Sequence, residues 1–330
     1  MAEFLTFDTD LTAVANAIRA KGGTSAQLIY PSGFVSAIQA IQTGITPKLV
    51  VTTTPGAAIT ATPAEGFKVV KGTAGADGMC TLELPKAGTW HVTAMANSVS
   101  NSQHIVIGTQ NMLLPLYHDT FANNTWEEII TVCRTGIAPD SWAVGDSKTM
   151  NIGGTAYQVD IIGKNHDEYA DGSGTAPLTF QLHDCYSEAK QMYSTNLSGL
   201  GWKNTDMRLA YLPAILALMP AEVQNGIRAV NKKTSEGGNS TTIEMVSDTL
   251  FLLSEVEIFG TASSSVAGEG SQYDYYKAGN PKIKKREGVD EFWWERSSAS
   301  GGMFCRVRAN GQAGASNASN SLGVSFAFCF

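Results

Sequence analysis

The chain has 330 residues, enough for roughly two domains and a short appendage. With 43% hydrophobic and 16% charged residues it has the composition of a folded globular protein, and its 33 glycines favour strands and loops over a helical bundle. A net charge of −7 argues against nucleic-acid binding, because phosphate contacts require clustered Lys and Arg.

Residues 1–20 do not have the pattern of a secretory signal. They carry Glu3, Asp8 and Asp10, where a signal has a basic start followed by a long apolar run. No stretch approaches the roughly 20 apolar residues that span a bilayer, so no membrane insertion is expected. We therefore expect synthesis in the cytoplasm, with any route outside by carriage on a larger particle or by lysis.

Residues 1–45 predict a helical hairpin. The spacing of Leu11, Val14 and Ile18 indicates one apolar helix face, and Phe34 and Ile41 belong to a second. Two helices this short are marginal alone. Their apolar faces predict self-association or docking on a neighbouring protein, and packing back on the same chain is the alternative.

Residues 46–110 change to an alternation of apolar and polar residues. Short runs such as FKVVKG and WHVTAMA are separated by turn signals such as Pro55-Gly56 and Asp77-Gly78. Runs of this length and spacing predict a small β-sandwich. The stretch GMCTLELPKAGTWHVTA resembles bacterial immunoglobulin-like and carboxypeptidase-regulatory-like modules, which implies a spacer.

Residues 111–330 mix helix and strand patterns, which predicts an α+β domain. A helix is expected over 124–133, with Thr125 as its cap. A hairpin is expected over 148–164, turning at Gly153-Gly154. Two further helices are expected over 207–218 and 220–228, the second with Pro220 in its first turn.

The residues that most often carry chemistry form no recognisable site. The acidic run 165–168 lacks the spacing of a calcium loop and is expected to be a solvated turn. His183 and Cys185 are too close in sequence to predict a catalytic pair. The five cysteines form no CxxC pair, and most are expected to be buried. Cys305 and Cys329 lie in similar alternating runs, and their pairing is left open.

Several motifs of the last domain occur together in a fixed order. They are VDIIGKNHDEYADGSGTAPLTFQ, GWKNTDMR, VNKKTSEGGNSTTIEMVSDTLFLLSEVEIFG, GEGSQYDYY, FWWERS and FCRVRANGQAGASNASNSLGVSFAFCF. Together they resemble a family of phage and prophage proteins with a tryptophan-rich C-terminal motif. The closing layout also resembles the variable proteins of diversity-generating retroelements, such as the major tropism determinant of phage tail fibres. The opening LTAVANAIRAKGG…YPSGFVSAIQAI resembles a module found at the start of many phage tail-associated proteins.

The resemblance implies a three-part architecture. Residues 1–45 would be a helical attachment or oligomerisation segment, 46–110 an immunoglobulin-like spacer, and 111–330 a C-type-lectin-like ligand-binding domain. That fold is close to the fold of formylglycine-generating enzymes, which are oxidases with active-site cysteines. Cys305 and Cys329 stand in no matching motif, and no phosphate loop, HExxH or GxSxG is present. We therefore expect no enzyme activity, no catalytic residue, no cofactor and no metal site.

The segment from Arg296 to Gly323 is rich in small polar residues, with 19 of its 28 residues being Ser, Gly, Ala or Asn. Apolar anchors flank it: Trp293 and Trp294 before it, and after it a strand with Val324, Phe326 and Phe328 on one face. Such a segment between anchors predicts a solvent-facing binding surface, as in antibody loops; an ordered polar loop region is the alternative. The predicted contact residues are Glu295, Ser297, Ser298, Ser300, Gly302, Met303, Phe304, Arg306, Arg308, Ala309, Gln312 and Ala315.

The retroelement resemblance implies a way to diversify this surface. Adenine-directed mutagenesis of asparagine codons yields Ser, Gly, Ala, Arg and Phe, but not Glu, Met or Gln. Glu295, Met303 and Gln312 therefore do not fit the scheme. The residues that fit it are Ser297, Ser298, Ser300, Gly302, Phe304, Arg306, Arg308 and Ala309.

These observations predict a receptor-binding adhesin of a phage tail, made in the bacterial cytoplasm and carried on the virion. Its partners would be a host-surface protein or glycan and other phage tail proteins, with no nucleic acid. It would assemble into a homo-oligomer, and tail-fibre relatives suggest a trimer. The alternatives are a structural tail or baseplate component, or a prophage-encoded surface adhesin of fixed specificity.

Overall fold

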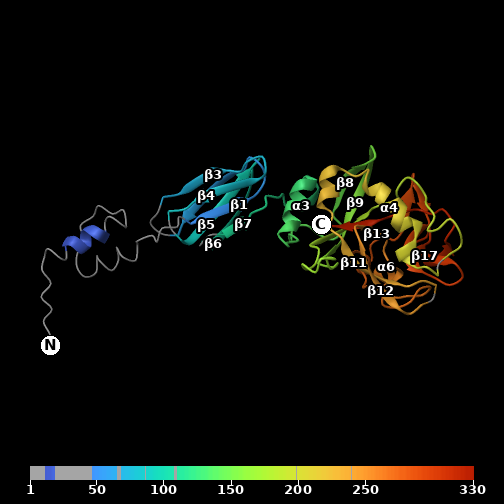
Figure 1. Ribbon diagram of the computed structural model, residues 1–330. Coiled ribbons are helices and arrows are strands. Elements are labelled where there is room, and N and C mark those ends of the chain that lie inside the picture. Colours follow the sequence, from blue (N-terminus) through green and yellow to red (C-terminus); the bar gives the residue numbers. More distant parts are fainter. Residues whose placement is uncertain are drawn as a thin grey trace, which may run out of the picture. The chain divides into compact units, whose positions relative to one another are not determined.

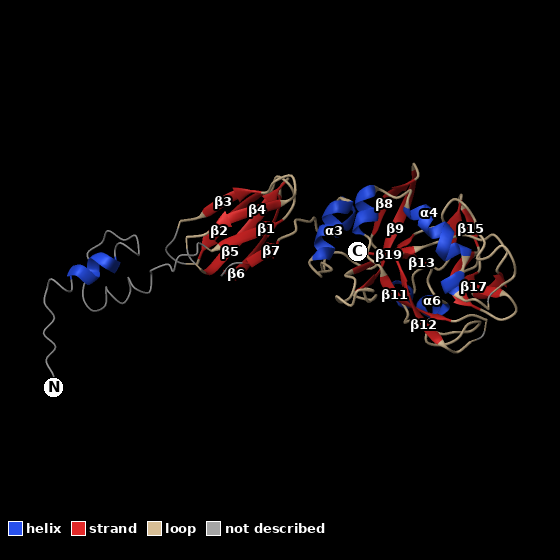
Figure 2. Cartoon of the chain, viewed as in Figure 1, coloured by secondary structure: helices blue, strands red, loops and turns tan. Residues whose placement is uncertain are grey.

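The computed structural model describes residues 12–18, 47–64, 68–85, 87–107, 110–197, 199–238 and 240–330. The chain divides into two compact units, Met1–Leu114 and Pro115–Phe330 (Figure 1). Its fold is mixed α+β, with most strands in several small antiparallel sheets and with few, short helices (Figure 2). Among the described residues, none of the helices has the length and hydropathy needed to cross a membrane.

The described part of the N-terminal segment is a short helix over residues 12–18, which confirms the first predicted helix there. Ala15 and Ile18 are buried, whereas Val14 is 47% exposed. The second predicted helix lies outside the described residues.

The rest of the first unit is two sheets, with strand orders β4-β1-β7 and β3-β2-β5-β6. All pairings are antiparallel except that of β1 with β7, which is parallel. Val51 of β1 and Trp90 of β5 are fully buried, as the alternation of apolar and polar residues predicts. The strands are β1 (Lys48–Thr52), β2 (Ala58–Pro63), β3 (Val70–Thr73), β4 (Met79–Glu83), β5 (Gly88–Ala96), β6 (Val99–Ile107) and β7 (Gln110–Leu113).

The second unit is built on a five-stranded sheet with the order β13-β19-β10-β9-β8. The predicted hairpin is confirmed, because Gly153 and Gly154 join β8 to β9 with φ angles of 58° and 87°. The strands of this sheet are β8 (Ser147–Ile152), β9 (Thr155–Lys164), β10 (Leu178–Leu182), β13 (Leu250–Phe251) and β19 (Ala327–Cys329).

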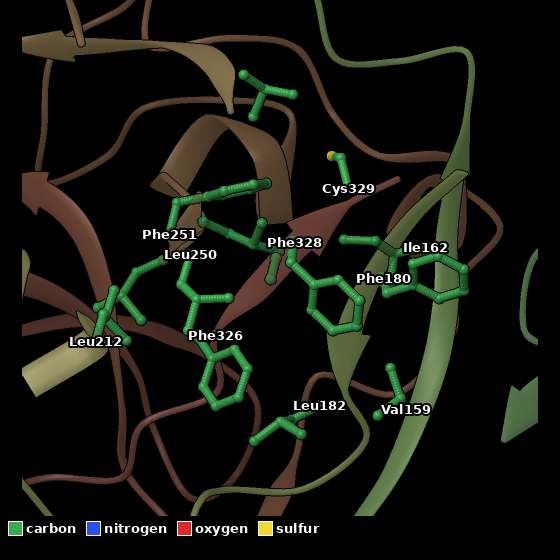
Figure 3. Packing of buried hydrophobic residues seen from close by; sticks show 14 of the residues in the cluster. Val159, Ile162, Phe180, Leu182, Leu212, Leu250, Phe251, Phe326, Phe328 and Cys329 are labelled. Carbon is green, nitrogen blue, oxygen red and sulfur yellow. The ribbon is translucent and has the colours of Figure 1, made fainter. Parts of the chain in front are cut away.

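The core of the second unit lies on both faces of this sheet. The rings of Phe180 in β10 and Phe328 in β19 stack with centroids 5.3 Å apart (Figure 3). Val324, Phe326 and Phe328 are fully buried, as predicted, and Ser325, Ala327 and Cys329 are fully buried as well. The closing strand is shorter than predicted, since β19 begins at Ala327, and both of its faces are buried because it pairs with strands on both sides within the core.

Helix α3 (Trp126–Arg134) begins where the sequence indicates. The Thr125 hydroxyl accepts a hydrogen bond from the backbone N–H of Glu128 at 3.1 Å, and the Glu128 carboxylate accepts one from the N–H of Thr125 at 2.8 Å. The helix predicted over 207–218 is instead a π-helical turn, η3, followed by a short α4, and Pro220 caps α5. The other helices are η1 (Phe121–Asn123), η2 (Trp202–Asn204), η3 (Met207–Tyr211), α4 (Leu212–Leu216), α5 (Ala221–Gly226), α6 (Glu255–Phe259) and α7 (Asp274–Lys277).

Smaller sheets complete the second unit: the pairs β11–β12 and β14–β15, and the three-stranded sheet β16-β17-β18. All five cysteines are free and buried. Cys305 lies in β17 and Cys329 in β19, which belong to different sheets and have different neighbours. The strands are β11 (Val230–Ser235), β12 (Ile243–Asp248), β14 (Lys284–Arg286), β15 (Val289–Glu291), β16 (Trp293–Ser298), β17 (Met303–Val307) and β18 (Ala313–Asn317).

Candidate ligand-binding surface

The predicted contact residues lie on the three-stranded sheet β16-β17-β18 and its turns. Strands β17 and β18 form a regular antiparallel hairpin, from Met303 opposite Asn317 to Val307 opposite Ala313. The pairing of β16 with β17 is interrupted between Trp294 and Ser298. In this interval the usual alternation of inward and outward side chains is lost. The interruption decides which predicted residues reach solvent.

The prediction of solvent exposure is wrong for four residues of the set. Glu295, Ser297 and Phe304 are fully buried and Ser298 is 1% exposed. The Ser297 hydroxyl accepts a hydrogen bond from the N–H of Glu255 at 3.0 Å, and the Ser298 hydroxyl donates to the carbonyl of Gly238 at 3.0 Å. These side chains hold the sheet to its neighbours and are not available to a ligand.

Gly302 is half-buried, and its position in the turn before β17 requires glycine. Its φ angle is 77°, and a Cβ placed there would lie 2.5 Å from the carbonyl oxygen of Asn196. Its own carbonyl accepts a hydrogen bond from the N–H of Ala318 at 3.0 Å. The retroelement resemblance had suggested that this position varies, but the backbone geometry disfavours every other residue.

The remaining predicted residues reach the surface of the hairpin and its turns. Ser300, Arg308 and Gln312 are exposed. A half-buried group joins them, consisting of Met303, Arg306, Ala309 and Ala315. This exposed set lies on one hairpin, but the strand register places Met303 and Ala315 on the face opposite Arg306. It is smaller than the sequence suggested.

The two arginines of the exposed set lie on the same face as Phe292. The Cζ atom of Arg306 lies 4.1 Å from the centre of the Phe292 ring, and its Nε donates to the carbonyl of Ala315 at 3.2 Å. The Arg308 side chain passes close to Gly314: a Cβ atom placed on Gly314 would lie 2.8 Å from the Nε atom of Arg308. The absence of a side chain at Gly314 therefore leaves room for Arg308 beside the strand.

A buried ionic network that the sequence did not predict anchors β16. The Arg296 guanidinium makes two hydrogen bonds to the Glu257 carboxylate and donates to the carbonyls of Leu252 at 3.0 Å and Lys233 at 2.9 Å. Burial lowers the pKa of Arg296, but the Glu257 carboxylate outweighs burial and raises it. Because every charge is paired, the network fixes β16 without exposing an unsatisfied group.

The network extends to the acidic run that was predicted to be a solvated turn. The Lys232 ammonium contacts the carboxylates of Glu257 and Asp167, each at 2.7 Å, and donates to the Tyr273 hydroxyl at 3.0 Å. Asp167 is 4% exposed, so the prediction of a solvated turn is wrong for this residue. Burial would raise the pKa of Asp167, but Lys232 and His166 hold it well below its usual range.

A cavity of about 240 Å³ lies over this network. His166, Asn231 and Lys233 contribute to its walls. The charged groups at its base pair with one another. In its wall the Nδ1 atom of His166 is buried without a hydrogen-bond partner among the described residues.

Buried carboxyl groups cluster behind the hairpin, on the side of Cys305. Both carboxyl oxygens of Glu295 and one of Glu269 are buried without a hydrogen-bond partner among the described residues. Burial and the neighbouring Glu255 and Glu269 raise the pKa of Glu295 well above its usual range, which favours the neutral acid. Within the part of the chain that the structure describes, no group of three or more His, Cys, Asp or Glu side chains is arranged to hold a metal ion.

Comparison with known proteins adds one similarity. Residues 179–330 match the model of a family described as a domain of unknown function, DUF6273. No curated protein matches the chain.

The DUF6273 match begins within β10 and ends with β19. It therefore includes the whole β16-β17-β18 sheet, the exposed set of the hairpin, and the ion pair of Arg296 with Glu257. It leaves out α3 and the β8–β9 hairpin, although β9 pairs directly with β10. The matched region thus depends on a strand outside the match to complete its main sheet.

Proposed function

We propose that the protein is a receptor-binding adhesin of a phage tail and that it binds its receptor through the β17–β18 hairpin, without covalent chemistry. The observation that carries the proposal is the contrast between the buried strand β16 and the exposed part of the hairpin that pairs with it. Trp293, Trp294 and Arg296 of β16 are fully buried, while Arg306 in β17 and Arg308 just after it reach solvent. A binding site needs such a rigid base under side chains that are free to contact a ligand.

The motifs of the last domain support this proposal through their resemblance to phage proteins with a C-type-lectin-like fold. On this proposal residues 111–330 adopt that fold and residues 46–110 serve as an immunoglobulin-like spacer. The helical segment 1–45 would attach the protein to other tail proteins and assemble it as a trimer on the virion. Several copies would strengthen weak single contacts through multivalency.

The structure narrows the surface that retroelement-type diversification can use. Of the residues that fit asparagine-codon mutagenesis, Ser300, Arg306, Arg308 and Ala309 are exposed or half-buried and have room to change. The others are buried or, at Gly302, restricted to glycine. On this proposal any diversity is concentrated at these few positions of the hairpin.

A second candidate is a protein of fixed specificity, either a structural tail or baseplate component or a prophage-encoded surface adhesin. The observation that favours it is that Ser297, Ser298 and Phe304 are buried and that both serine hydroxyls are hydrogen-bonded within the fold. Few positions of the segment are then left that could vary. In that case the hairpin would bind one constant partner.

The test is binding of the labelled full chain to intact bacterial cells of a strain panel, measured by flow cytometry. We expect saturable binding to a subset of strains. An Arg306→Ser/Gln312→Ala variant should lose this binding, and a matched Glu168→Gln variant, changed at an exposed residue outside the hairpin, should keep it. Loss of binding in neither variant would remove the hairpin as the receptor site. Saturable binding to purified tail proteins, with none to cells, would favour the structural component.

A further inference from the structure

The exposed arginines of the hairpin lack the partners that arginines usually have. The Arg306 side chain uses only its Nε, in a hydrogen bond to a backbone carbonyl, and the Arg308 side chain makes no hydrogen bond within the part of the chain described. In the same described residues neither forms an ion pair, although Arg286 and Arg296 both pair with glutamates. The terminal guanidinium nitrogens of both residues are therefore free to donate.

Their placement together has an energetic cost. Partial burial and the neighbouring Arg308 lower the pKa of Arg306, as expected when two cations lie close together. The chain as a whole carries a net charge of −7, so the local positive charge of the two arginines is opposite in sign to the net charge of the protein. Arg306 lies against the Phe292 ring and Arg308 against Gly314, and neither contact supplies a negative charge. An anion bound between the two groups would relieve the repulsion.

The size of the hairpin limits the ligand. Each of its strands has five residues, which span about 17 Å, and paired strands lie about 4.8 Å apart. A strip two strand-widths across therefore covers on the order of 160 Å², far below the roughly 800 Å² that each partner buries in a typical stable protein–protein complex. A saccharide chain fits such a strip, and the exposed part of Phe292 can pack against a sugar ring.

We infer that the receptor bound by this hairpin is a saccharide chain bearing phosphate or carboxylate groups, held by Arg306 and Arg308 beside Phe292. The inference rests on the proposed adhesin function and specifies its ligand. Guanidinium groups donate in pairs to phosphate and carboxylate oxygens, which gives directional as well as electrostatic recognition. Ser300, in the turn before β17, and Gln312, directly before β18, would add hydrogen bonds to sugar hydroxyls.

The direct test is calorimetric titration of the full chain with poly(glycerol phosphate), polygalacturonate and neutral dextran. We expect binding to at least one anionic polymer and none to dextran. An Arg306→Gln/Arg308→Gln variant should bind at least about tenfold more weakly. A Lys233→Gln/Lys285→Gln variant removes the same charge from exposed positions elsewhere and should stay within about twofold of the wild type. Equal losses in both variants, or no binding to either anionic polymer, would overturn the inference.

Cell binding separates this inference from the proposed function. Protease treatment of the cells should leave binding unchanged, because the ligand is not a protein, and the anionic polymer that binds in the titration should compete with the cells. Binding that is lost after protease, or that survives the double arginine substitution, overturns the saccharide assignment and leaves the adhesin role in place. Arginine-dependent polymer binding without binding to any strain supports the anionic-saccharide site and counts against the adhesin role.

Discussion

Arg296 and Glu257 form a doubly hydrogen-bonded ion pair in the interior of the second unit, joining β16 to α6. Glu257 also contacts Lys232, which in turn contacts Asp167. One chain of alternating charges thus connects β16, α6, β11 and the segment after β9. This network anchors β16, the strand that pairs with β17 of the hairpin.

Arg296→Leu should reduce the free energy of unfolding of the second unit by about 3–5 kcal/mol, because it removes one partner of a buried charge pair. It also removes the donors to the carbonyls of Leu252 and Lys233. Urea unfolding followed by tryptophan fluorescence measures the change, since all tryptophans other than Trp90 lie in this unit.

The matched control is Lys203→Ala, which breaks the ion pair with Glu244. The N–O distance of this pair is 2.9 Å, but the Lys203 side chain is 53% exposed, so its loss should cost less than about 1 kcal/mol. If the two substitutions have similar effects, the interior network does not contribute as argued.

Glu295→Gln should make the stability of the protein less dependent on pH. The pKa of Glu295 is raised in the folded state, so its contribution is complete below the unfolded pKa of about 4.3 and is lost as the pH rises. The variant should therefore gain stability relative to the wild type between about pH 5 and 8, with a slope of at most about 1.4 kcal/mol per pH unit. Unfolding free energies measured across this range give the slope.

The neighbouring Glu255, Glu269 and Arg296 remain in both proteins, so the difference between wild type and variant isolates Glu295. Glu168→Gln, at an exposed carboxylate, serves as the control for removing a carboxyl group outside the buried cluster. A flat difference for Glu295→Gln would show that the pKa of its carboxyl group is not raised in the folded state.

The sequence correctly predicted those features in which the interacting residues are close together along the chain. Thr125 and Glu128 lie three positions apart and form the capping box that starts α3, and Gly153-Gly154 makes the turn of the β8–β9 hairpin. In each case the residues that interact are close together in the chain. A pattern of residue types is then sufficient to locate the element.

The sequence could not predict which of the predicted contact residues are buried. Alternation along β16 would place Glu295 and Ser297 on one face and Arg296 on the other, but the interrupted pairing with β17 buries all three. The partners of Arg296 come from α6 and β11, far away in the chain. The sequence shows only that Arg296 lies in the stretch WWERSS, close to the predicted tryptophan anchors. Which groups pair with its guanidinium is visible only in the tertiary structure.

Gly302→Ala should destabilise the second unit more than Gly301→Ala. Both glycines have positive φ angles, 68° for Gly301 and 77° for Gly302, so both substitutions carry a backbone penalty of about 1–2 kcal/mol. Only at Gly302 would the new Cβ lie 2.5 Å from the Asn196 carbonyl, whereas at Gly301 its nearest neighbour is the Met303 methyl group at 3.8 Å. Melting temperatures of the two variants give the comparison, and equal shifts would show that the turn relaxes away from Asn196.

Codon randomisation of the terminal segment should separate structural from ligand-facing positions. In a displayed library selected for protease resistance, Ser300, Arg306, Arg308 and Ala309 should accept many residues, because they are exposed or half-buried. Phe304 should remain large and apolar, since replacing a buried Phe by a small residue costs about 3–5 kcal/mol.

Sequencing of natural populations descended from one clone then tests diversification. Substitutions traceable to template adenines at the tolerant positions would support it. A uniform segment would instead favour fixed specificity, because tolerance without natural variation means that one receptor constrains the hairpin.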